Sequence, residues 1–258
     1  MIVNLEEKNA LVTGASRGIG RACALSLARA GARVLAVARS ADALEDLSLY
    51  IEKEGGTCIP ITFDLSEREK LSGLHELIKD RVGMVDILVN NAGTYSTDSI
   101  EDDQFLSGWD QTINLNLSIP GYLTRLFAKA MIEKNWGRIV NISSISGTKG
   151  EAYGVSYSAS KFGIIGVTQA LALELAPHGI TINAVCPGWV DTDMARDQLN
   201  DPKWCKLNNI DQSQSLDIAR LSVPQQRFLE PDEVAWLVTF LCSEKAKGIT
   251  GQAINLCE

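Results

Sequence analysis

Continuous apolar runs alternate with helix-period segments from one end of the chain to the other, and this alternation restricts the possible folds most strongly. Runs typical of buried strands span residues 9–14, 32–38, 57–66, 85–93, 137–144, 180–188 and 253–256. Segments with helical spacing span residues 18–31, 40–54, 71–78, 109–134, 157–175 and 231–242. Strands that are apolar along their whole length are buried on both faces, as in a parallel sheet covered by helices. We therefore expect a single α/β domain over residues 1–258, with a doubly wound parallel sheet of about seven strands.

Two segments depart from this rhythm. Pro120 lies inside the helix expected over 109–134 and predicts a bend there. Residues 189–228 are polar and irregular, and a long insertion of this kind is typical of a lid over a binding site. In this expected lid, Trp189, Met194 and Trp204 either line an apolar pocket or pack as ordinary core.

Charge and composition exclude several classes of protein. The net charge is −8, with 24 Lys and Arg against 32 Asp and Glu, so neither nucleic acid nor an anionic membrane is an expected partner. Apolar runs are too short for a membrane span and the start of the chain lacks the pattern of a signal peptide, so we expect a cytoplasmic protein. The six cysteines are scattered without a C-x-x-C pair, which predicts neither a disulfide framework nor a metal site.

A glycine-rich turn joins the first expected strand to the first expected helix. Thr13 to Gly20 reads TGASRGIG, and its glycines allow a tight turn and a close approach to a pyrophosphate. The helix N-terminus adds free N–H groups and positive potential. This pattern predicts a dinucleotide site of the Rossmann type, with contacts from Gly14, Ser16, Arg17, Gly18, Ile19 and Gly20.

The end of the second expected strand selects the dinucleotide. A carboxylate there would bond the ribose 2′-hydroxyl and repel a 2′-phosphate, whereas this strand ends on Arg39. Arg17, inside the glycine turn, carries a second guanidinium that could hold the same phosphate. Two solvated surface arginines are the alternative interpretation, but the missing acid favours NADP(H).

Tyr157 and Lys161 lie four residues apart on the strongest expected helix, in the sequence YSASK. This spacing puts both side chains on one helix face. An ammonium beside a phenol stabilises the phenolate, so we expect Lys161 to make Tyr157 a better acid and base near neutral pH.

The order of the motifs resembles that of the short-chain dehydrogenase/reductase family over essentially the whole chain. The matching pieces, in order, are TGASRGIG, FDLS, NNAG, NLNLS, NISSISG, YSASK and NAVCPGWVDT. The resemblance implies a Rossmann-type fold and an oxidoreductase. It implies a catalytic set of Asn116, Ser144, Tyr157 and Lys161.

The resemblance also implies a role for each member of that set. Asn116 would order a helix and a water-linked proton path, with Asn114 as an alternative. Ser144 would hydrogen-bond the substrate carbonyl, with Ser143 as an alternative. Tyr157 would donate the proton, and Lys161 would bind the nicotinamide ribose.

Further binding roles follow from the same resemblance. Asp64 and Leu65 would flank the adenine. The nucleotide groove and the nicotinamide end would be lined by Asn90, Ala92, Gly93, Pro187, Gly188, Val190 and Thr192. Substrate contacts would come from Ser144, Tyr153, Tyr157, Trp189 and Met194.

The implied activity is NADPH-dependent reduction of a ketone, with a substrate similar to a 3-oxoacyl thioester or a polyketide-like carbonyl. A free bulky or cyclic ketone, or the corresponding secondary alcohol, is an alternative substrate, and a non-catalytic nucleotide-binding regulator is an alternative of another class. The family implies a homotetramer. Two features argue against docking of an acidic acyl carrier protein. The net charge of −8 would repel it. Carrier-protein reductases of the family often have basic residues where this chain has Asn135–Trp136 and His178.

Overall fold

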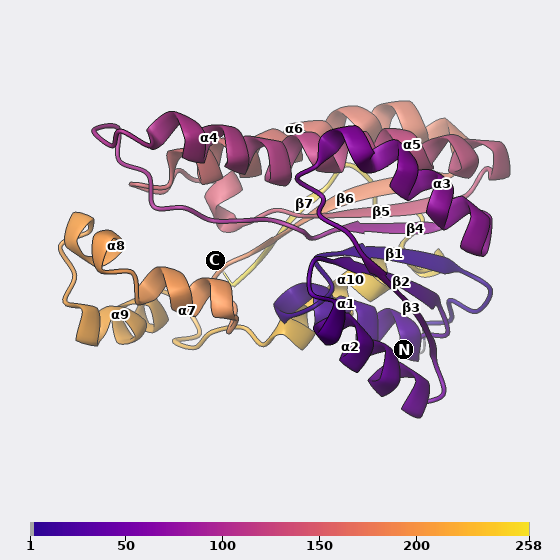
Figure 1. Cartoon of the computed structure of the whole chain (residues 1–258), viewed down its shortest axis with the longest axis horizontal. Helices are drawn as coiled ribbons and strands as arrows, with labels where there is room; N and C mark the ends of the chain where they lie inside the picture. The colour runs from indigo at the N-terminus through magenta and orange to yellow at the C-terminus, as the bar shows by residue number, and fades with distance from the viewer. Residues whose placement is uncertain (1–2, 258) are drawn as a thin grey trace.

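Seven parallel strands form one sheet at the centre of the computed structural model, which describes residues 3–257 (Figure 1). The strand order is β3-β2-β1-β4-β5-β6-β7, and every neighbouring pair is parallel. The predicted single α/β domain with a doubly wound sheet is confirmed. The strands are β1 (Asn9–Thr13), β2 (Arg33–Ala38), β3 (Thr57–Thr62), β4 (Ile87–Asn90), β5 (Gly137–Ile142), β6 (Ile180–Pro187) and β7 (Ala253–Leu256).

Helices cover both faces of the sheet (Figure 1). One layer contains α1 (Gly18–Arg29), α2 (Ala41–Lys53) and α10 (Pro231–Leu241), and the opposite layer contains α3 (Leu71–Val82), α4 (Phe105–Ile113), α5 (Ile119–Lys134) and α6 (Val155–Leu175). Each layer buries its own apolar cluster against the sheet. The predicted Ser cap of α2 is present, because the Ser40 hydroxyl accepts a hydrogen bond from the N–H of Ala43.

The helix expected over 109–134 is not one helix bent at Pro120. It consists of α4, a π-helical turn at Asn114–Ser118, and α5, in which Pro120 is the second residue. Proline has no N–H and its ring crowds the carbonyl four residues earlier, which here belongs to Asn116. The wider π turn takes up this misfit before the proline, so the irregularity precedes the position that the sequence indicated.

The sequence predicts an irregular segment over residues 189–228, called the lid segment below, but the structure shows short helices there. The lid segment contains α7 (Asp193–Leu199), α8 (Pro202–Leu207) and α9 (Ser215–Leu221), and it projects beyond the carboxyl ends of the strands (Figure 1). Thr192 and Asp201 cap the first two helices. The three helices pack around a small cluster of their own that includes Leu199, Trp204 and Ala219. Short capped helices of this kind carry too few apolar residues for a periodic pattern to reveal them.

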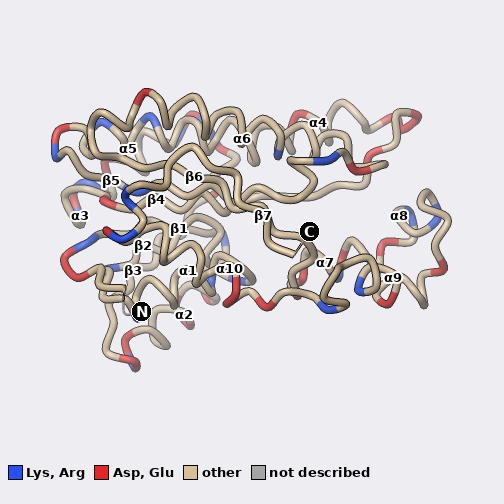
Figure 2. The backbone as a smooth tube through the Cα atoms, turned by 180° about the vertical axis from the view of Figure 1, so that it is seen from behind, with Lys and Arg blue, Asp and Glu red and all other residues tan. Residues whose placement is uncertain are grey.

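Positions of Lys and Arg and positions of Asp and Glu are interspersed along the backbone of the outer helices and loops (Figure 2). Within residues 3–257, no helix combines the length and the apolar character that crossing a membrane requires. The strands, by contrast, consist mostly of buried apolar residues, and their carboxyl ends open into the loops that build the site described next.

Candidate active site

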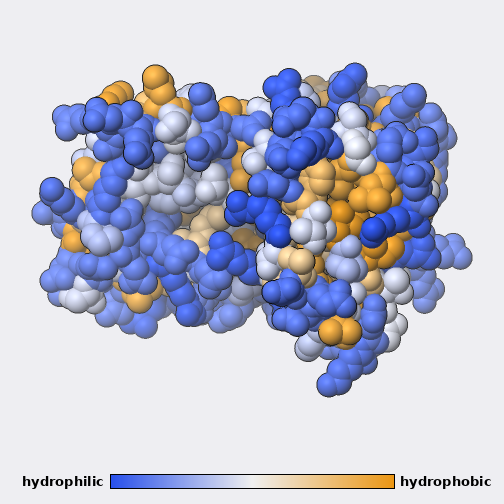
Figure 3. All heavy atoms as spheres, viewed as in Figure 1, coloured by the Kyte–Doolittle hydropathy of each residue, from blue (hydrophilic) through white to orange (hydrophobic). Residues whose placement is uncertain are grey.

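A cavity of about 950 Å³ lies at the carboxyl ends of β1 to β6, between the sheet edge and the lid segment. Figure 3 shows a hollow between the lid helices and the layer above them. Strands that end at one edge of a parallel sheet bring their following loops together there, which explains why distant motifs meet. The expected site residues that line the cavity are Gly14, Ser16, Arg17, Gly18, Ile19, Arg39, Asp64, Leu65, Ala92, Gly93, Ser144, Tyr157, Lys161, Pro187, Gly188, Trp189, Val190, Thr192 and Met194.

Four expected site residues lie outside the lining: Gly20, Asn90, Tyr153 and Asn116. Asn90 is buried and donates to the side chain of Asn141 at 2.8 Å, while the next residue, Asn91, lines the cavity. Successive side chains at a strand end point to opposite faces, so a shift of one position reverses the direction. Tyr153 is exposed, with a left-handed φ of 59°.

The glycine turn has the backbone that the sequence predicted. Gly14 and Gly18 have φ of 65° and 53°, a region that favours glycine. A Cβ at Gly20 would lie 2.2 Å from the carbonyl oxygen of Gly14, so this glycine holds α1 against the turn without lining the cavity. No side chain caps the N-terminus of α1 at Arg17, and the first N–H groups of the helix are therefore open to an anion. These features fit a dinucleotide pyrophosphate.

Arg39 and Arg17 stand at the rim of the same cavity. Arg39 is exposed directly after β2. Arg17 donates to Asp193 of the lid segment at 3.2 Å, and both side chains are more than half exposed. The pKa of the nearby Asp64 carboxyl is lowered mainly by hydrogen bonds from Ser66 and to a smaller extent by Arg39. The rim therefore combines two guanidinium groups with an ionised carboxylate.

Tyr157 and Lys161 share one face of α6, as predicted. The Lys161 Nζ lies 5.3 Å from the centroid of the Tyr157 ring and donates to the backbone carbonyl of Ile142 at 2.9 Å. Burial lowers the pKa of Lys161 to about 8. Burial also raises the pKa of Tyr157 to about 12, although a hydrogen bond with Ser144 opposes the rise. The expectation that Lys161 lowers the pKa of the phenol is wrong for this structure, because desolvation dominates and the ammonium faces a carbonyl.

The structure distinguishes the environments of Asn116 and Asn114, and those of Ser144 and Ser143. Asn116 is buried beside α6 and exchanges two 2.8 Å hydrogen bonds with the backbone of Thr94, whereas the amide of Asn114 donates to the carbonyl of Ser66. Ser143 donates to the backbone carbonyl of Lys161 at 2.9 Å. Ser144 instead interacts with the Tyr157 side chain and donates to the Ser146 hydroxyl at 3.3 Å.

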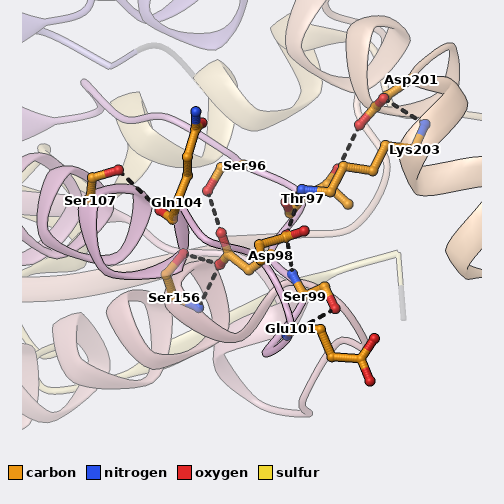
Figure 4. A network of polar contacts seen from close by, with 11 residues as sticks. Ser96, Thr97, Asp98, Ser99, Glu101, Gln104, Ser107, Ser156, Asp201 and Lys203 are labelled. Carbon is orange, nitrogen blue, oxygen red and sulfur yellow. Dashed lines mark hydrogen bonds and ion pairs between the residues drawn. The ribbon is translucent and has the colours of Figure 1, made fainter.

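Another polar network ties the lid segment to the start of α6 (Figure 4). Thr97 donates to Asp201 at 2.7 Å, and Lys203 Nζ donates to the carbonyl of Thr97 at 2.8 Å. The neighbouring Asp98 is buried and accepts hydrogen bonds from both the backbone N–H and the hydroxyl of Ser156 on the first turn of α6. The loop around Thr97 therefore connects the lid segment with the helix that carries Tyr157.

The chain also matches known proteins over most of its length. A sequence model described as short chain dehydrogenase matches residues 8–203, a range that includes the glycine turn, Ser144, Tyr157 and Lys161. The chain belongs to the short-chain dehydrogenase family. The interpretation of the ordered motifs is thus confirmed at the level of the family.

Relatives of this short-chain dehydrogenase include an uncharacterized oxidoreductase and two named reductases. It is 39% identical to the uncharacterized oxidoreductase YxjF of Bacillus subtilis, over 98% of this chain and 97% of that protein. It is 36% identical to the 3-oxoacyl-(acyl-carrier-protein) reductase FabG of Vibrio harveyi, with the same two coverages. A variant of actinorhodin polyketide ketoreductase, solved with NADPH, is 37% identical with a TM-score of 0.89, over 97% of this chain and 95% of that one.

Four polar residues in the cavity of this short-chain dehydrogenase were not predicted from the sequence. Asn91, Ser146, Glu151 and Gln198 line the cavity but were not expected there. Glu151 lies in the loop between Ser144 and Tyr157, so a carboxylate inside the catalytic stretch was the available signal. No group of three or more His, Cys, Asp or Glu within residues 3–257 is arranged to hold a metal ion.

Proposed function

We propose that this short-chain dehydrogenase is an NADPH-dependent reductase that transfers a hydride to the carbonyl carbon of a ketone. The observation that carries the proposal is the meeting of Ser144, Tyr157 and Lys161 in one cavity with the open N-terminus of α1. The substrate we propose is a 3-oxoacyl thioester or a polyketide-like carbonyl. The identity with a 3-oxoacyl reductase and with a polyketide ketoreductase supports this class.

The chain would act on the substrate oxygen. When bound, the reduced nicotinamide supplies the hydride. Ser144 and Tyr157 then donate hydrogen bonds to the carbonyl oxygen, where negative charge develops. Tyr157 gives its proton to that oxygen. The high pKa of the Tyr157 hydroxyl suits this role, because the hydroxyl stays protonated until negative charge forms on the substrate oxygen. Lys161, next to Tyr157, would bind the nicotinamide ribose, and Asn116 would hold the backbone of Thr94 in place.

The choice of NADPH rests on the rim of the cavity. Arg39 follows β2, where a carboxylate would otherwise select the unphosphorylated ribose, and Arg17 stands across the glycine turn. Both guanidinium groups are exposed and can turn towards a 2′-phosphate. The Arg17 ion pair with Asp193 is exposed and weak, so it does not prevent this turn.

A free bulky or cyclic ketone is the second candidate substrate. Trp189, Met194 and Trp204 all line the cavity, and these side chains give the lid segment an apolar wall. We propose that the lid segment, about residues 189–228, covers the substrate and excludes water from it. Such a wall favours a small molecule that is fully enclosed.

We further propose that the protein is a homotetramer that works in the cytoplasm. The helix α6 leaves Val155, Phe162 and Leu173 exposed along one face, which suits contact with another subunit. All six cysteines are free, and five of them are buried, which suits a reducing compartment.

The decisive experiment is the substitution Tyr157→Phe. The variant keeps the ring and its packing against Tyr95 but loses the proton donor. We expect NADPH oxidation with a ketone to fall about a thousandfold, because general acid catalysis contributes roughly that factor. NADPH affinity, measured by fluorescence titration, should stay within about twofold. Normal turnover by the variant would remove Tyr157 from the proposed role.

A further inference from the structure

Glu151 is the centre of a polar cluster inside the cavity. Its Oε1 accepts hydrogen bonds from the Tyr95 hydroxyl at 3.2 Å and from the Gln198 amide at 2.7 Å. Its Oε2 accepts one hydrogen bond, from the Ser146 hydroxyl at 3.0 Å. A carboxyl group offers about four acceptor positions, so Oε2 keeps capacity for one more partner. Burial raises the pKa of the Glu151 carboxyl, and the hydrogen bonds from its side-chain partners oppose that rise.

Trp204 adds an unused donor to the same cavity. Its side chain is 7% exposed, it lines the cavity, and its indole N–H makes no hydrogen bond with the described residues. The indole interacts with the Glu151 carboxyl and opposes the rise in its pKa, but its N–H does not reach full hydrogen-bond geometry with that carboxyl. A buried N–H without an acceptor is costly, so the indole N–H of Trp204 calls for a partner that the protein itself does not supply.

This cluster adjoins the reacting centre. Ser146, which donates to Glu151, also accepts a hydrogen bond from the Ser144 hydroxyl at 3.3 Å. Ser144 is the group that would hold the substrate carbonyl. A substrate bound at Ser144 therefore places atoms that lie a few bonds from its carbonyl beside Glu151 and Trp204.

We propose that Glu151 and Trp204 form a subsite for a hydroxyl group of the substrate, so that the enzyme prefers ketones that carry a second, hydroxylated carbon. A hydroxyl both donates and accepts, and it can therefore donate to Oε2 of Glu151 while it accepts from the indole N–H of Trp204. This inference rests on the proposed ketone reduction and narrows its substrate class. Within that class it selects oxygenated, polyketide-like or cyclic hydroxyketones over thioesters with a plain hydrocarbon chain.

Other substrate groups complete the cluster less well. A hydrocarbon chain at this place would leave the spare acceptor position of Oε2 and the indole N–H of Trp204 without a partner. An ammonium group would satisfy Glu151 but would offer no acceptor to Trp204. A second carboxylate would meet the charge of Glu151 at close range.

The test compares matched ketones on the whole enzyme with NADPH. The probes are cyclohexanone, 3-hydroxycyclohexanone, 4-hydroxycyclohexanone and 4-aminocyclohexanone, with 2-pentanone and 5-hydroxy-2-pentanone as an open-chain pair. We expect the kcat/KM of at least one hydroxyketone to exceed that of its parent by about tenfold or more, since a site built to bond a hydroxyl rejects an analogue without it. Glu151→Leu and Trp204→Phe should each reduce this ratio to below about threefold.

Matched controls separate the subsite from general damage. Trp236→Phe on α10 and Glu45→Leu on α2 change exposed residues of the same types and should keep the wild-type ratio. Trp204→Phe keeps an aromatic ring of similar shape, so it tests the N–H if Glu151→Leu fails to fold. Equal kcat/KM for parent and hydroxyketones, a stronger preference for the aminoketone, or an unchanged ratio in both variants would overturn the proposal.

Calorimetry distinguishes this proposal from the proposed function. Binding of the hydroxylated and parent rings is measured on the Tyr157→Phe variant saturated with oxidised NADP. If no ketone is reduced by the wild type but the hydroxylated ring binds about tenfold tighter, and Trp204→Phe abolishes the difference, the subsite stands and the reductase assignment falls. If neither reduction nor selective binding is found, both fall.

Discussion

Lys161 shows how a single residue acquires properties that its sequence position does not reveal. The spacing in YSASK predicts that Lys161 lies beside Tyr157, as it does. It does not predict the hydrogen-bond partner of Lys161, which is the backbone carbonyl of Ile142. The pKa of Lys161 falls to about 8 because the ammonium is removed from water. Sequence reasoning gives which residues share a helix face, whereas the balance between desolvation and charge depends on packing in three dimensions.

The folded pKa of Lys161 lies below its unfolded value, and this fixes the pH dependence of stability. Between about pH 8 and pH 10.5 the unfolded chain binds a proton that the folded chain has lost, so this residue makes folding more favourable as pH rises. Below pH 8 the buried ammonium destabilises the fold by a constant amount. We therefore expect Lys161→Met to be more stable than the wild type at pH 7 and to lose this advantage by about 1.4 kcal/mol per pH unit above pH 8.

Urea denaturation of both proteins between pH 7 and 9.5 measures this difference. Tyr157 and the buried cysteines titrate in both proteins, so the difference in the free energy of unfolding isolates Lys161. A difference that does not change with pH would contradict the assigned pKa.

Arg39 decides the cofactor preference in our interpretation. Loss of a charge-assisted contact to the 2′-phosphate should raise the KM for NADPH about tenfold or more in Arg39→Ala and leave the KM for NADH nearly unchanged. Arg33→Ala, at the other end of β2, is the matched control. Initial rates with both nucleotides give the comparison, and an equal effect on NADPH and NADH would exclude a 2′-phosphate contact.

At the scale of elements, apolar periodicity predicted the sheet and its covering helices but not the two segments that shape the cavity. The π turn at Asn114–Ser118 reflects a local conflict around Pro120, and α7 to α9 are held by caps and by packing on their own small cluster. Neither cause produces a repeating pattern in the sequence. The predicted residues of the strand-end loops line the cavity, whereas Asn91 lines it in place of the predicted Asn90, because side-chain orientation at a strand end is not visible in the sequence.

The contacts of Lys203 make the position of the lid segment testable. Its ammonium reaches the carbonyl of Thr97 at 2.8 Å and the carboxylate of Asp102 at 2.7 Å. Such partly exposed contacts are worth about 1 kcal/mol, or about fivefold in an equilibrium. We expect Lys203→Met to raise the KM for the ketone by up to about fivefold and to accelerate hydrogen exchange in α7 to α9.

Lys206→Met on the same helix changes an exposed lysine and should affect neither quantity. If exchange accelerates in the lid segment without any change in KM, the lid segment does not cover the substrate.

At the scale of the whole molecule, one helix joins the proposed chemistry to the proposed assembly. The positions 155, 162 and 173 lie near one line along α6, because steps of seven and eleven residues are close to whole numbers of turns. The exposed fractions of Val155, Phe162 and Leu173 are 44%, 47% and 84%, so this line of apolar side chains is open to solvent in the single chain.

Light scattering of the wild type should therefore give about four times the mass of one chain. Leu173→Glu puts a charge on this face and should shift the mass towards dimers or monomers. Leu49→Glu on α2, an exposed leucine in the other helical layer, is the control and should leave the mass unchanged. A wild-type mass of one chain would contradict the assembly.

The double use of α6 has a consequence for how the enzyme behaves on dilution. The helix presents Tyr157 and Lys161 to the cavity and Phe162 and Leu173 to the outside. A second subunit packed on the outer face would therefore restrict the motion of the helix that carries the proton donor. Specific activity would then depend on the enzyme concentration in the assay. It would decline when the protein is diluted below the dissociation constant of the subunits.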